Sequence, residues 1–343
     1  MDAYSKLTEL VHQGLDIRLV LAPPRSGSTM LEKVLSASNT FDKAIHEPFI
    51  DYGYRGIEEA RCYEQLLSEI EGSDILIKDM AHFLTNKAVF ERFVSLIDKP
   101  IVYNLRNPLL CAESRIKVML KSTAIKPRTS TQTWLLDYLA KNHSNWETIS
   151  EVEKSRLVGR QDFSIANLKL QTGLLNYYAK TKGESDWEQL VSNASAEQTY
   201  SHLGDFLSSN PKRFSLSGFG WGAVGEQLAH LDKINKPYLI INNTDFRNNP
   251  EYFSKAICES WNIDYNESML NWDEISIGEK QCRAQDKVWY ESIINSSSVK
   301  PPTEPVPPIK AFPEFIQNYL NDVAIPIYEK AMESKLSVKV KVR

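Results

Sequence analysis

Residues 21–31, LAPPRSGSTML, decide the fold, because a short loop of small residues there joins an apolar run to a helical pattern. The apolar run over residues 17–21 lies between Asp16 and a pair of prolines, which is typical of a buried strand. Residues 29–38 then alternate apolar and polar side chains at helical spacing. Backbone N–H groups at the start of such a helix point toward one place, where the helix dipole favours an anion. The stretch therefore predicts a phosphate-binding loop between a strand and a helix.

The side chains of this loop suit a phosphate. Ser26, Ser28 and Thr29 bring hydroxyl donors. Gly27 lets the backbone approach a ligand closely, and Arg25 brings a positive charge. An ordinary helix start also favours Ser and Thr, so the loop alone is equally compatible with a capped helix that binds no ligand. The loop lacks the first glycine and the lysine of the G-x-x-x-x-G-K-[ST] pattern, which disfavours standard nucleoside triphosphate hydrolysis.

Outward from the loop, strand-length apolar runs alternate with helical patterns. The further strand candidates are residues 75–77, 101–103 and 238–241. The further helix candidates are residues 58–71, 87–97 and 108–121. Alternation of strands and helices predicts an α/β fold, a parallel β-sheet flanked by helices.

The length of 343 residues suits one large domain or two ordinary ones. We expect a single domain over residues 1–343, whose core comprises residues 15–121 and 237–275. Residues 122–236 contain no comparable strand, and their amphipathic stretches favour a helical insertion.

The last part of the chain contains a proline-rich segment. Residues 300–308 read KPPTEPVPP, a composition typical of an extended, polyproline-like conformation. The segment is predicted to lead into a C-terminal helix over about 313–333. Residues 337–343 alternate like an edge strand, and a frayed terminus explains them equally well.

Charge and hydropathy exclude several classes of partner. The chain has 40 basic and 44 acidic residues, so no global positive field favours nucleic acid or an anionic membrane surface. No apolar stretch approaches the roughly 18 residues of a membrane span, and the first ten residues lack the basic start and apolar run of a signal peptide. We therefore expect a cytoplasmic protein without nucleic-acid or membrane partners. The sequence does not indicate the oligomeric state.

The four cysteines, Cys62, Cys111, Cys258 and Cys282, are far apart and form no C-x-x-C pair. This spacing argues against a zinc site, a thioredoxin-type redox site and a disulfide framework. We expect free thiols and no metal centre.

Residues 24–29, PRSGST, match every position of the pattern P-[KR]-[ST]-G-[ST]-[ST]. In this stretch the chain resembles the PAPS-dependent sulfotransferases, which use 3′-phosphoadenosine 5′-phosphosulfate (PAPS) as donor. Their 5′-phosphosulfate loop carries this pattern between the first strand and the first helix of a P-loop-type fold. The resemblance implies that residues 25–29 bind the donor, and Arg25 looks like the arginine of the Golgi and bacterial branches.

A second match lies at residues 101–108, IVYNLRNP, with Ser114 eight residues after Arg106. In the family this Arg and Ser bind the 3′-phosphate. An arginine at a strand end and a hydroxyl on the next helix can converge on one phosphate, and the arginine makes the hydrogen bonds charge-assisted. Either residue alone is also compatible with an ordinary surface position. Their spacing, together with the loop, favours a nucleotide that has two phosphate sites.

Further matches are similar to the small-molecule branch of the family. They are HEPF at residues 46–49, KDMAH at 78–82, NNTDFRNNP at 242–250 and MLNW at 269–272. Residues from about 122 to 220 show no match, so the resemblance does not cover the expected insertion, which would lie on the acceptor side.

The resemblance implies transfer of a sulfuryl group from PAPS to a small-molecule acceptor, at a hydroxyl or, as the second choice, an amine. Negative charge grows on the leaving phosphate oxygen, so fixed cations and backbone donors there supply the main stabilisation. Arg25 is the first candidate for this role. Lys78 either reaches the transferring group or forms a structural salt bridge. No metal is required.

A hydroxyl acceptor also needs a base within hydrogen-bond reach. Glu47 is the first candidate, because in the topology that the resemblance implies it follows a strand beside the phosphate loop, and several non-cytosolic family branches use a glutamate as base. His82 is the second, since it misses the histidine position of the cytosolic branch by two residues. A structural hydrogen bond before Pro48 explains Glu47 equally simply, and a helix cap or core position explains His82.

Two other functions stay open at this point. A P-loop kinase using Mg-ATP would place Asp79, at a strand end, on the metal ion. A non-catalytic scaffold would keep the nucleotide site without turnover. The missing lysine disfavours the kinase, and the presence of Arg25, Glu47, Arg106 and Ser114 disfavours the scaffold.

Overall fold

The computed structural model describes residues 2–125, 216–271, 293, 296–312 and 314–338. The chain divides into two compact units. The first comprises Met1–Arg115, Leu216–Val306 and Tyr319–Arg343, and the second comprises Ile116–Ser215 and Pro307–Asn318. All the predicted site residues belong to the first unit. The expectation of a single domain stays a prediction.

The first unit is built on a five-stranded parallel sheet with the order β2-β3-β1-β4-β5. The strands are β1 (Asp16–Ala22), β2 (Lys43–His46), β3 (Asp74–Met80), β4 (Ile101–Leu105) and β5 (Tyr238–Asn242). The predicted α/β class with a parallel sheet is confirmed. Because all strands run the same way, their carboxyl ends meet at one edge, where ligands bind in open α/β sheets.

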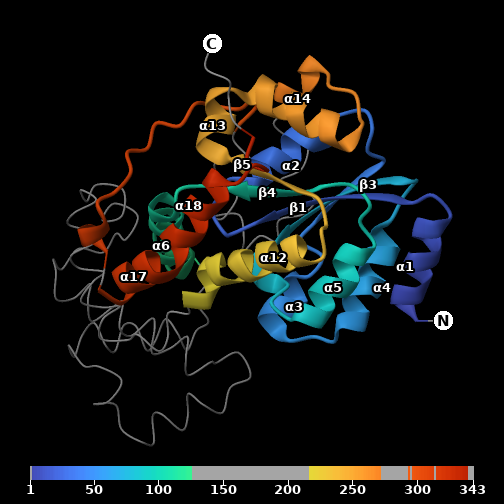
Figure 1. Cartoon of the computed structure of the whole chain (residues 1–343), viewed down its shortest axis with the longest axis horizontal. Coiled ribbons are helices and arrows are strands. Elements are labelled where there is room, and N and C mark those ends of the chain that lie inside the picture. The colour runs from blue at the N-terminus through green and yellow to red at the C-terminus, as the bar shows by residue number, and fades with distance from the viewer. Residues whose placement is uncertain (1, 126–215, 272–292, 294–295, 313, 339–343) are drawn as a thin grey trace, which may run out of the picture. The chain divides into compact units, whose positions relative to one another are not determined.

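Helices cover both faces of the sheet (Figure 1). On one face lie α2 (Ser28–Ser36), α13 (Asn243–Asn248) and α14 (Pro250–Trp261). On the other lie α1 (Ala3–His12), α3 (Ile50–Arg55), α4 (Glu59–Glu69), α5 (Lys87–Ser95) and α12 (Trp221–Lys233). Helix α6 (Pro108–Ile125) follows β4, and α17 (Glu314–Tyr319) and α18 (Ile325–Glu333) come last.

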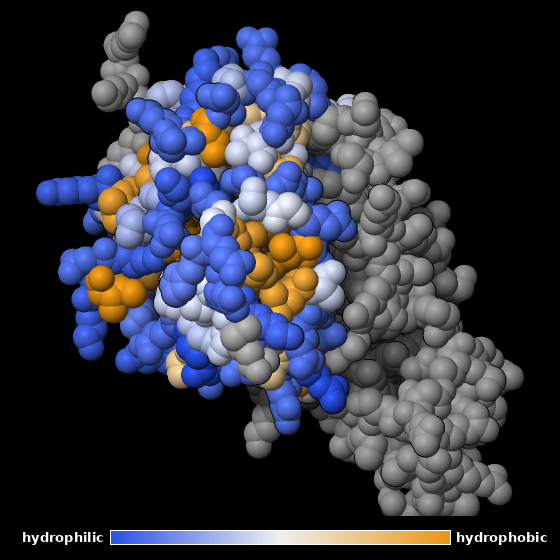
Figure 2. All heavy atoms as spheres, turned by 90° about the vertical axis from the view of Figure 1, so that its right-hand side faces the viewer, coloured by the Kyte–Doolittle hydropathy of each residue, from blue (hydrophilic) through white to orange (hydrophobic). Residues whose placement is uncertain are grey.

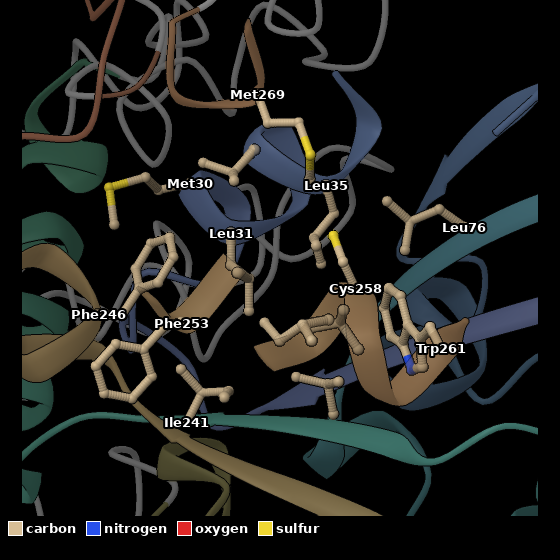
Figure 3. Packing of buried hydrophobic residues seen from close by; sticks show 14 residues of the cluster. Met30, Leu31, Leu35, Leu76, Ile241, Phe246, Phe253, Cys258, Trp261 and Met269 are labelled. Atoms are coloured by element: carbon tan, nitrogen blue, oxygen red, sulfur yellow. The ribbon is translucent and has the colours of Figure 1, made fainter. Parts of the chain in front are cut away.

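The core between the sheet and α2 and α14 is apolar (Figure 3). Its members include Val20, Leu31, Leu35, Leu76, Val102, Ile241, Phe253, Ile257 and Trp261. A parallel sheet is buried on both faces, which is why its strands appear in the sequence as continuous apolar runs. Burying one such side chain contributes roughly 1.5–3 kcal/mol, so this layer holds the loop after β1 on a rigid base.

Only residues 122–125 and 216–236 of the expected insertion are among the described residues. Helix α12 belongs to the first unit, because it buries Trp221, Val224 and Leu231. Its Gln227 also donates hydrogen bonds to the carbonyls of Ala81 (2.8 Å) and Leu84 (3.1 Å). The helical character is as expected, but the helix supports the sheet. Residues 126–215 lie outside the described residues.

The C-terminal helix expected over 313–333 is interrupted. A π-helical turn, Leu320–Ala324, separates α17 from α18. Pro326 lies in the first turn of α18 and has no N–H to donate to the preceding turn, which accounts for the wider turn.

The residues after α18 extend the sheet. The N–H of Ile240 donates to the carbonyl of Leu336 (2.9 Å), and the N–H of Val338 donates to the carbonyl of Ile240 (3.0 Å). Ser337 thus forms an isolated parallel bridge with Ile240 of β5, a pairing of the kind that the edge-strand interpretation of residues 337–343 predicts. Residues 339–343 lie outside the described residues.

The surface that Figure 2 shows is mostly hydrophilic, with apolar residues scattered over it. Cys62, Cys111 and Cys258 are buried free thiols, whereas Cys282 lies outside the described residues. Within the part of the chain that the structure describes, no helix combines the length and the apolar character needed to cross a bilayer.

Candidate active site

The loop between β1 and α2 makes two left-handed turns. Arg25 has a φ of 65° and Gly27, which caps α2, has a φ of 85°. A Cβ atom on Gly27 would lie only 2.6 Å from Asn243 Nδ2, so glycine is required for space as well as for conformation. The first N–H groups of α2 precede its first complete turn and are available to an anion.

A side chain of β4 fastens this loop to the sheet. Asn104 is fully buried, and its Nδ2 donates to the carbonyl of Ser26 (3.0 Å). Ser26 is buried too, with its Oγ 3.5 Å from the same Nδ2, so its side chain supports the loop from within the fold. Ser28 is also buried, whereas Thr29 is partly exposed.

Three of the predicted phosphate ligands meet beside the loop. Arg25 Nε donates to Ser114 Oγ (3.0 Å), although the two residues are 89 positions apart. Arg106 Nη1 donates to the carbonyl of Arg25 (3.4 Å). The carboxyl end of β4, the second turn of α6 and the loop after β1 therefore bring Arg106, Ser114 and Arg25 close together.

A chain of four charged or polar side chains lies next to the loop. Lys78, fully buried in β3, donates from Nζ to Glu47 Oε1. His46 Nε2 lies 3.4 Å from the same Glu47 oxygen, and His46 Nδ1 lies 2.6 Å from Glu32 Oε2. Parallel pairing explains the arrangement, since His46 and Lys78 occupy matching positions in β2 and β3 and Glu32 lies one turn into α2.

The backbone at Glu47 is unusual. Its φ is 51°, in the left-handed region that non-glycine residues rarely adopt. Its N–H donates to the carbonyl of Lys78 (2.7 Å), which continues the β2–β3 pairing by one residue. Such conformations cost about 1–3 kcal/mol and persist where the surroundings enforce them. The turn directs the Glu47 carboxylate to Lys78.

The protonation states of these four contacting side chains depend on one another. Burial opposes the ionised form of Glu47, but Lys78 and His46 outweigh burial and hold the Glu47 pKa below its ordinary value. Burial likewise opposes protonation of His46, yet Glu32 and Glu47 together raise the His46 pKa above its ordinary value. Glu47 is therefore ionised at neutral pH.

Asp79 and His82 do not belong to this set of four contacting side chains. Asp79 accepts the N–H of Phe49 at Oδ2 (3.0 Å) and that of Met80 at Oδ1 (2.7 Å). Burial, together with repulsion from Glu47, raises the Asp79 pKa to about 7. Burial and then the charge of Arg115 lower the pKa of His82 to about 3, which makes it a weak base.

One segment of the chain is similar to a known protein family. Residues 219–336 match the family model of a sulfotransferase domain. The resemblance to sulfotransferases is confirmed. The matched range contains α12, β5, α13 and α14.

Similarity to individual proteins is weak. A solved structure described as "Sulfotransferase Domain from the Curacin Biosynthetic Pathway" has 11% sequence identity and a TM-score of 0.32. The alignment covers 96% of this chain and 93% of that one. No curated protein matches the sequence.

The candidate site contains polar residues that the sequence analysis did not select. Glu32 is fully buried beside His46, and Asn104 and Asn243 lie against the loop after β1. Asn104 Oδ1 and Asn243 Nδ2 are buried without a hydrogen-bond partner among the described residues. Asn104 follows three apolar strand residues, and Glu32 interrupts an apolar helix face. A polar residue at a position where the pattern predicts the core was therefore the sequence signal that could have identified both.

Proposed function

We propose that this sulfotransferase uses PAPS as donor and transfers its sulfuryl group to a hydroxyl of a small-molecule acceptor, with an amine as the second choice. One observation carries the proposal: Arg25, predicted from the loop of residues 24–29, contacts both Ser114 and Arg106, which were predicted from a second sequence segment. Two phosphate-binding elements close to each other suit a nucleotide that has phosphates at both the 5′ and the 3′ positions.

The donor would be held by two sets of groups. The N–H groups from Gly27 to Thr29 and the Arg25 guanidinium would face the 5′-phosphosulfate, while Arg106 and Ser114 would face the 3′-phosphate. The left-handed turn at Gly27 supports the first set, because it opens the start of α2 to an anion. The contact between Arg25 and Ser114 supports the second, because it joins the two sets.

In the transfer step the bond between sulfur and the leaving phosphate oxygen breaks as a bond from sulfur to the acceptor oxygen forms. Charge that develops on the leaving oxygen is stabilised by Arg25 and by the N–H groups at the start of α2. The acceptor proton passes to Glu47. Charge stabilisation by fixed donors of this kind commonly contributes several kcal/mol.

Glu47 is the proposed base because it is ionised and its contacts leave one oxygen for the acceptor. Among the described residues, Lys78 and His46 both contact Oε1, which leaves Oε2 to accept a proton. We assign Lys78 a positioning role, since its ammonium group keeps Glu47 ionised. His82 is the second candidate, since none of the contacts described for it places it beside the loop after β1; burial and the charge of Arg115 lower its pKa to about 3.

The contacts of Asp79 favour sulfuryl transfer over the kinase alternative. Both of its oxygens accept backbone N–H groups, at Phe49 and Met80, which gives the carboxylate a structural role. The scaffold alternative differs from the proposal only in turnover, so kinetics must separate them.

The test combines binding and turnover. Adenosine 3′,5′-bisphosphate, the product of the donor, should raise the melting temperature in the presence of EDTA, and ATP with Mg²⁺ should raise it less. Labelled PAPS with a panel of hydroxylated metabolites should then yield a labelled product. A melting curve that responds only to ATP with Mg²⁺ would contradict the proposal, and binding without turnover of any acceptor would favour the scaffold.

A further inference from the structure

A carboxylate of the proline-rich segment lies between two arginines at the edge of the sheet. Glu304 Oε2 is 3.6 Å from Arg106 Nη2 and 3.3 Å from Arg247 Nη1. Arg106 follows β4 and Arg247 lies on α13 after β5, and β4 and β5 are paired neighbours. Two adjacent strand ends thus present guanidinium groups to a single anionic oxygen.

The segment over residues 300–306, called the strap below, is held mainly through these groups. Arg247 donates from Nε to the carbonyl of Lys300 (2.8 Å) and from Nη2 to the carbonyl of Pro301 (3.0 Å). The N–H of Thr303 donates to Glu304 Oε2 (3.2 Å). Prolines bring no N–H groups, and Val306 is 52% exposed, so the strap has few other anchors.

The charges at this site suit a phosphate better than a carboxylate. A phosphate monoester carries about −1.5 to −2 charges at neutral pH and has three acceptor oxygens, whereas Glu304 offers a single charge. Two guanidinium groups can each form paired hydrogen bonds with a phosphate. Glu304 is also 48% exposed at its side chain, so an entering ligand can displace it.

We propose that Arg106 and Arg247 together form the site of the donor's 3′-phosphate, and that Glu304 occupies this site until the donor displaces the strap. The inference rests on the proposed function, since that assigns Arg106 to the 3′-phosphate. It adds Arg247 as a second binding residue and makes the strap an internal competitor of the donor. A nucleotide without a 3′-phosphate binds without releasing the strap.

The first test measures dissociation constants of two nucleotides by calorimetry. Glu304→Gln should bind adenosine 3′,5′-bisphosphate roughly 3-fold to 10-fold more tightly than the wild type, because a competing ion pair is lost. Its affinity for adenosine 5′-monophosphate should not change. Glu329→Gln is the matched control, since Glu329 is exposed on α18 and its substitution changes the net charge equally.

The second test concerns Arg247. Arg247→Ala should weaken binding of the bisphosphate by about 10-fold or more and leave the monophosphate unaffected. In this background Glu304→Gln should have a smaller effect than in the wild type, because the two residues share one site. Arg247→Lys should restore part of the affinity, which a purely structural role would not require.

Amide hydrogen exchange measures release of the strap directly. The bisphosphate should increase exchange at the N–H groups of Thr303 and Glu304, and the monophosphate should not. Unchanged or weaker bisphosphate binding by Glu304→Gln would overturn the inference while leaving the proposed function intact. Failure of the wild type and all variants to bind the bisphosphate would instead overturn the proposed function.

Discussion

Glu47 and Lys78 are joined twice, once through the backbone and once through their side chains. The N–H of Glu47 donates to the carbonyl of Lys78 at 2.7 Å, and Lys78 Nζ donates to Glu47 Oε1. The backbone hydrogen bond fixes the position of the Glu47 backbone, from which the carboxylate extends. The side-chain bond to the Lys78 ammonium group favours the ionised form of that carboxylate. If Glu47 is the base, as proposed, this placement means that it needs little reorganisation before it accepts a proton.

Replacement of the base should abolish turnover and spare binding. Glu47→Gln keeps the size of the side chain and removes the proton acceptor, so we expect turnover to fall by about 10²-fold to 10⁴-fold. Affinity for adenosine 3′,5′-bisphosphate should stay near that of the wild type. Steady-state kinetics with the true acceptor and calorimetry measure the two quantities.

The rival base is tested in the same assays. His82→Ala should keep most of the turnover, because the low pKa of this histidine makes it a weak base. If His82→Ala is almost inactive and Glu47→Gln is fully active, the base is His82. Melting curves must accompany both variants, since Glu47→Gln leaves the buried ammonium of Lys78 without its carboxylate.

Removal of the Lys78 charge should move the pH profile. The proposed function requires ionised Glu47, and Lys78 holds the Glu47 pKa below its ordinary value. In Lys78→Met this attraction is absent while burial remains, so the Glu47 pKa rises. The acidic limb of the profile of turnover against pH should therefore shift to higher pH. An unchanged limb would show that another group controls it.

The same pair makes stability depend on pH. Because the Glu47 pKa is lower in the folded chain than its ordinary value of 4.5, its contribution is fully present above that value. It is lost as the pH falls through the folded value. Unfolding of the wild type and of Lys78→Met by denaturant between pH 3 and pH 6, roughly the range around an ordinary glutamate pKa, should show a steeper loss for the wild type.

Arg106→Ala should affect only nucleotides that have a 3′-phosphate. The expected loss in binding of adenosine 3′,5′-bisphosphate is roughly 1.5–3 kcal/mol, the usual range for a hydrogen bond to a charged group. Adenosine 5′-phosphosulfate lacks the 3′-phosphate and should bind the variant and the wild type about equally. Equal losses for both ligands would assign Arg106 to the loop, whose Arg25 carbonyl it contacts, instead of to the phosphate.

Gly27→Ala should damage both folding and binding. The residue has a φ of 85°, and a Cβ atom would lie 2.6 Å from the Asn243 side chain. We expect the free energy of unfolding to fall by about 1–3 kcal/mol and nucleotide affinity to fall with it. Gly222→Ala is the matched control, because Gly222 lies within α12 with open space around it. Alanine there should be neutral or slightly stabilising.

Most of the sheet is readable from the sequence, because buried parallel strands leave continuous apolar runs. The expected strands at 17–21, 101–103 and 238–241 lie within the observed bounds of β1, β4 and β5. Residues 75–77 mark β3 in the same way, and the helices after β1, β3 and β4 begin within one residue of their predicted starts.

Long-range polar pairs leave no such pattern. Arg247 and Glu304 are 57 positions apart and His46 and Glu32 are 14 apart, at spacings unrelated to helical or strand periods. Such pairs depend on how strands are ordered in the sheet, which local patterning does not specify. The membership of α12 in the first unit is not readable from the sequence for the same reason, since an amphipathic helix does not indicate which surface it covers.

The pairing of residues 336–338 with β5 has a consequence for solubility. Among the described strands, β5 lies at one end of the sheet, and an uncovered edge there would offer its N–H and C=O groups to a strand of another molecule. Instead, the carbonyl of Leu336 accepts the N–H of Ile240, and the N–H of Val338 donates to the carbonyl of Ile240. A three-residue cover is short, yet it blocks the centre of β5, which an invading strand would need. These residues therefore act against aggregation, a role that lies apart from catalysis and would constrain how far the chain can be shortened in engineering work.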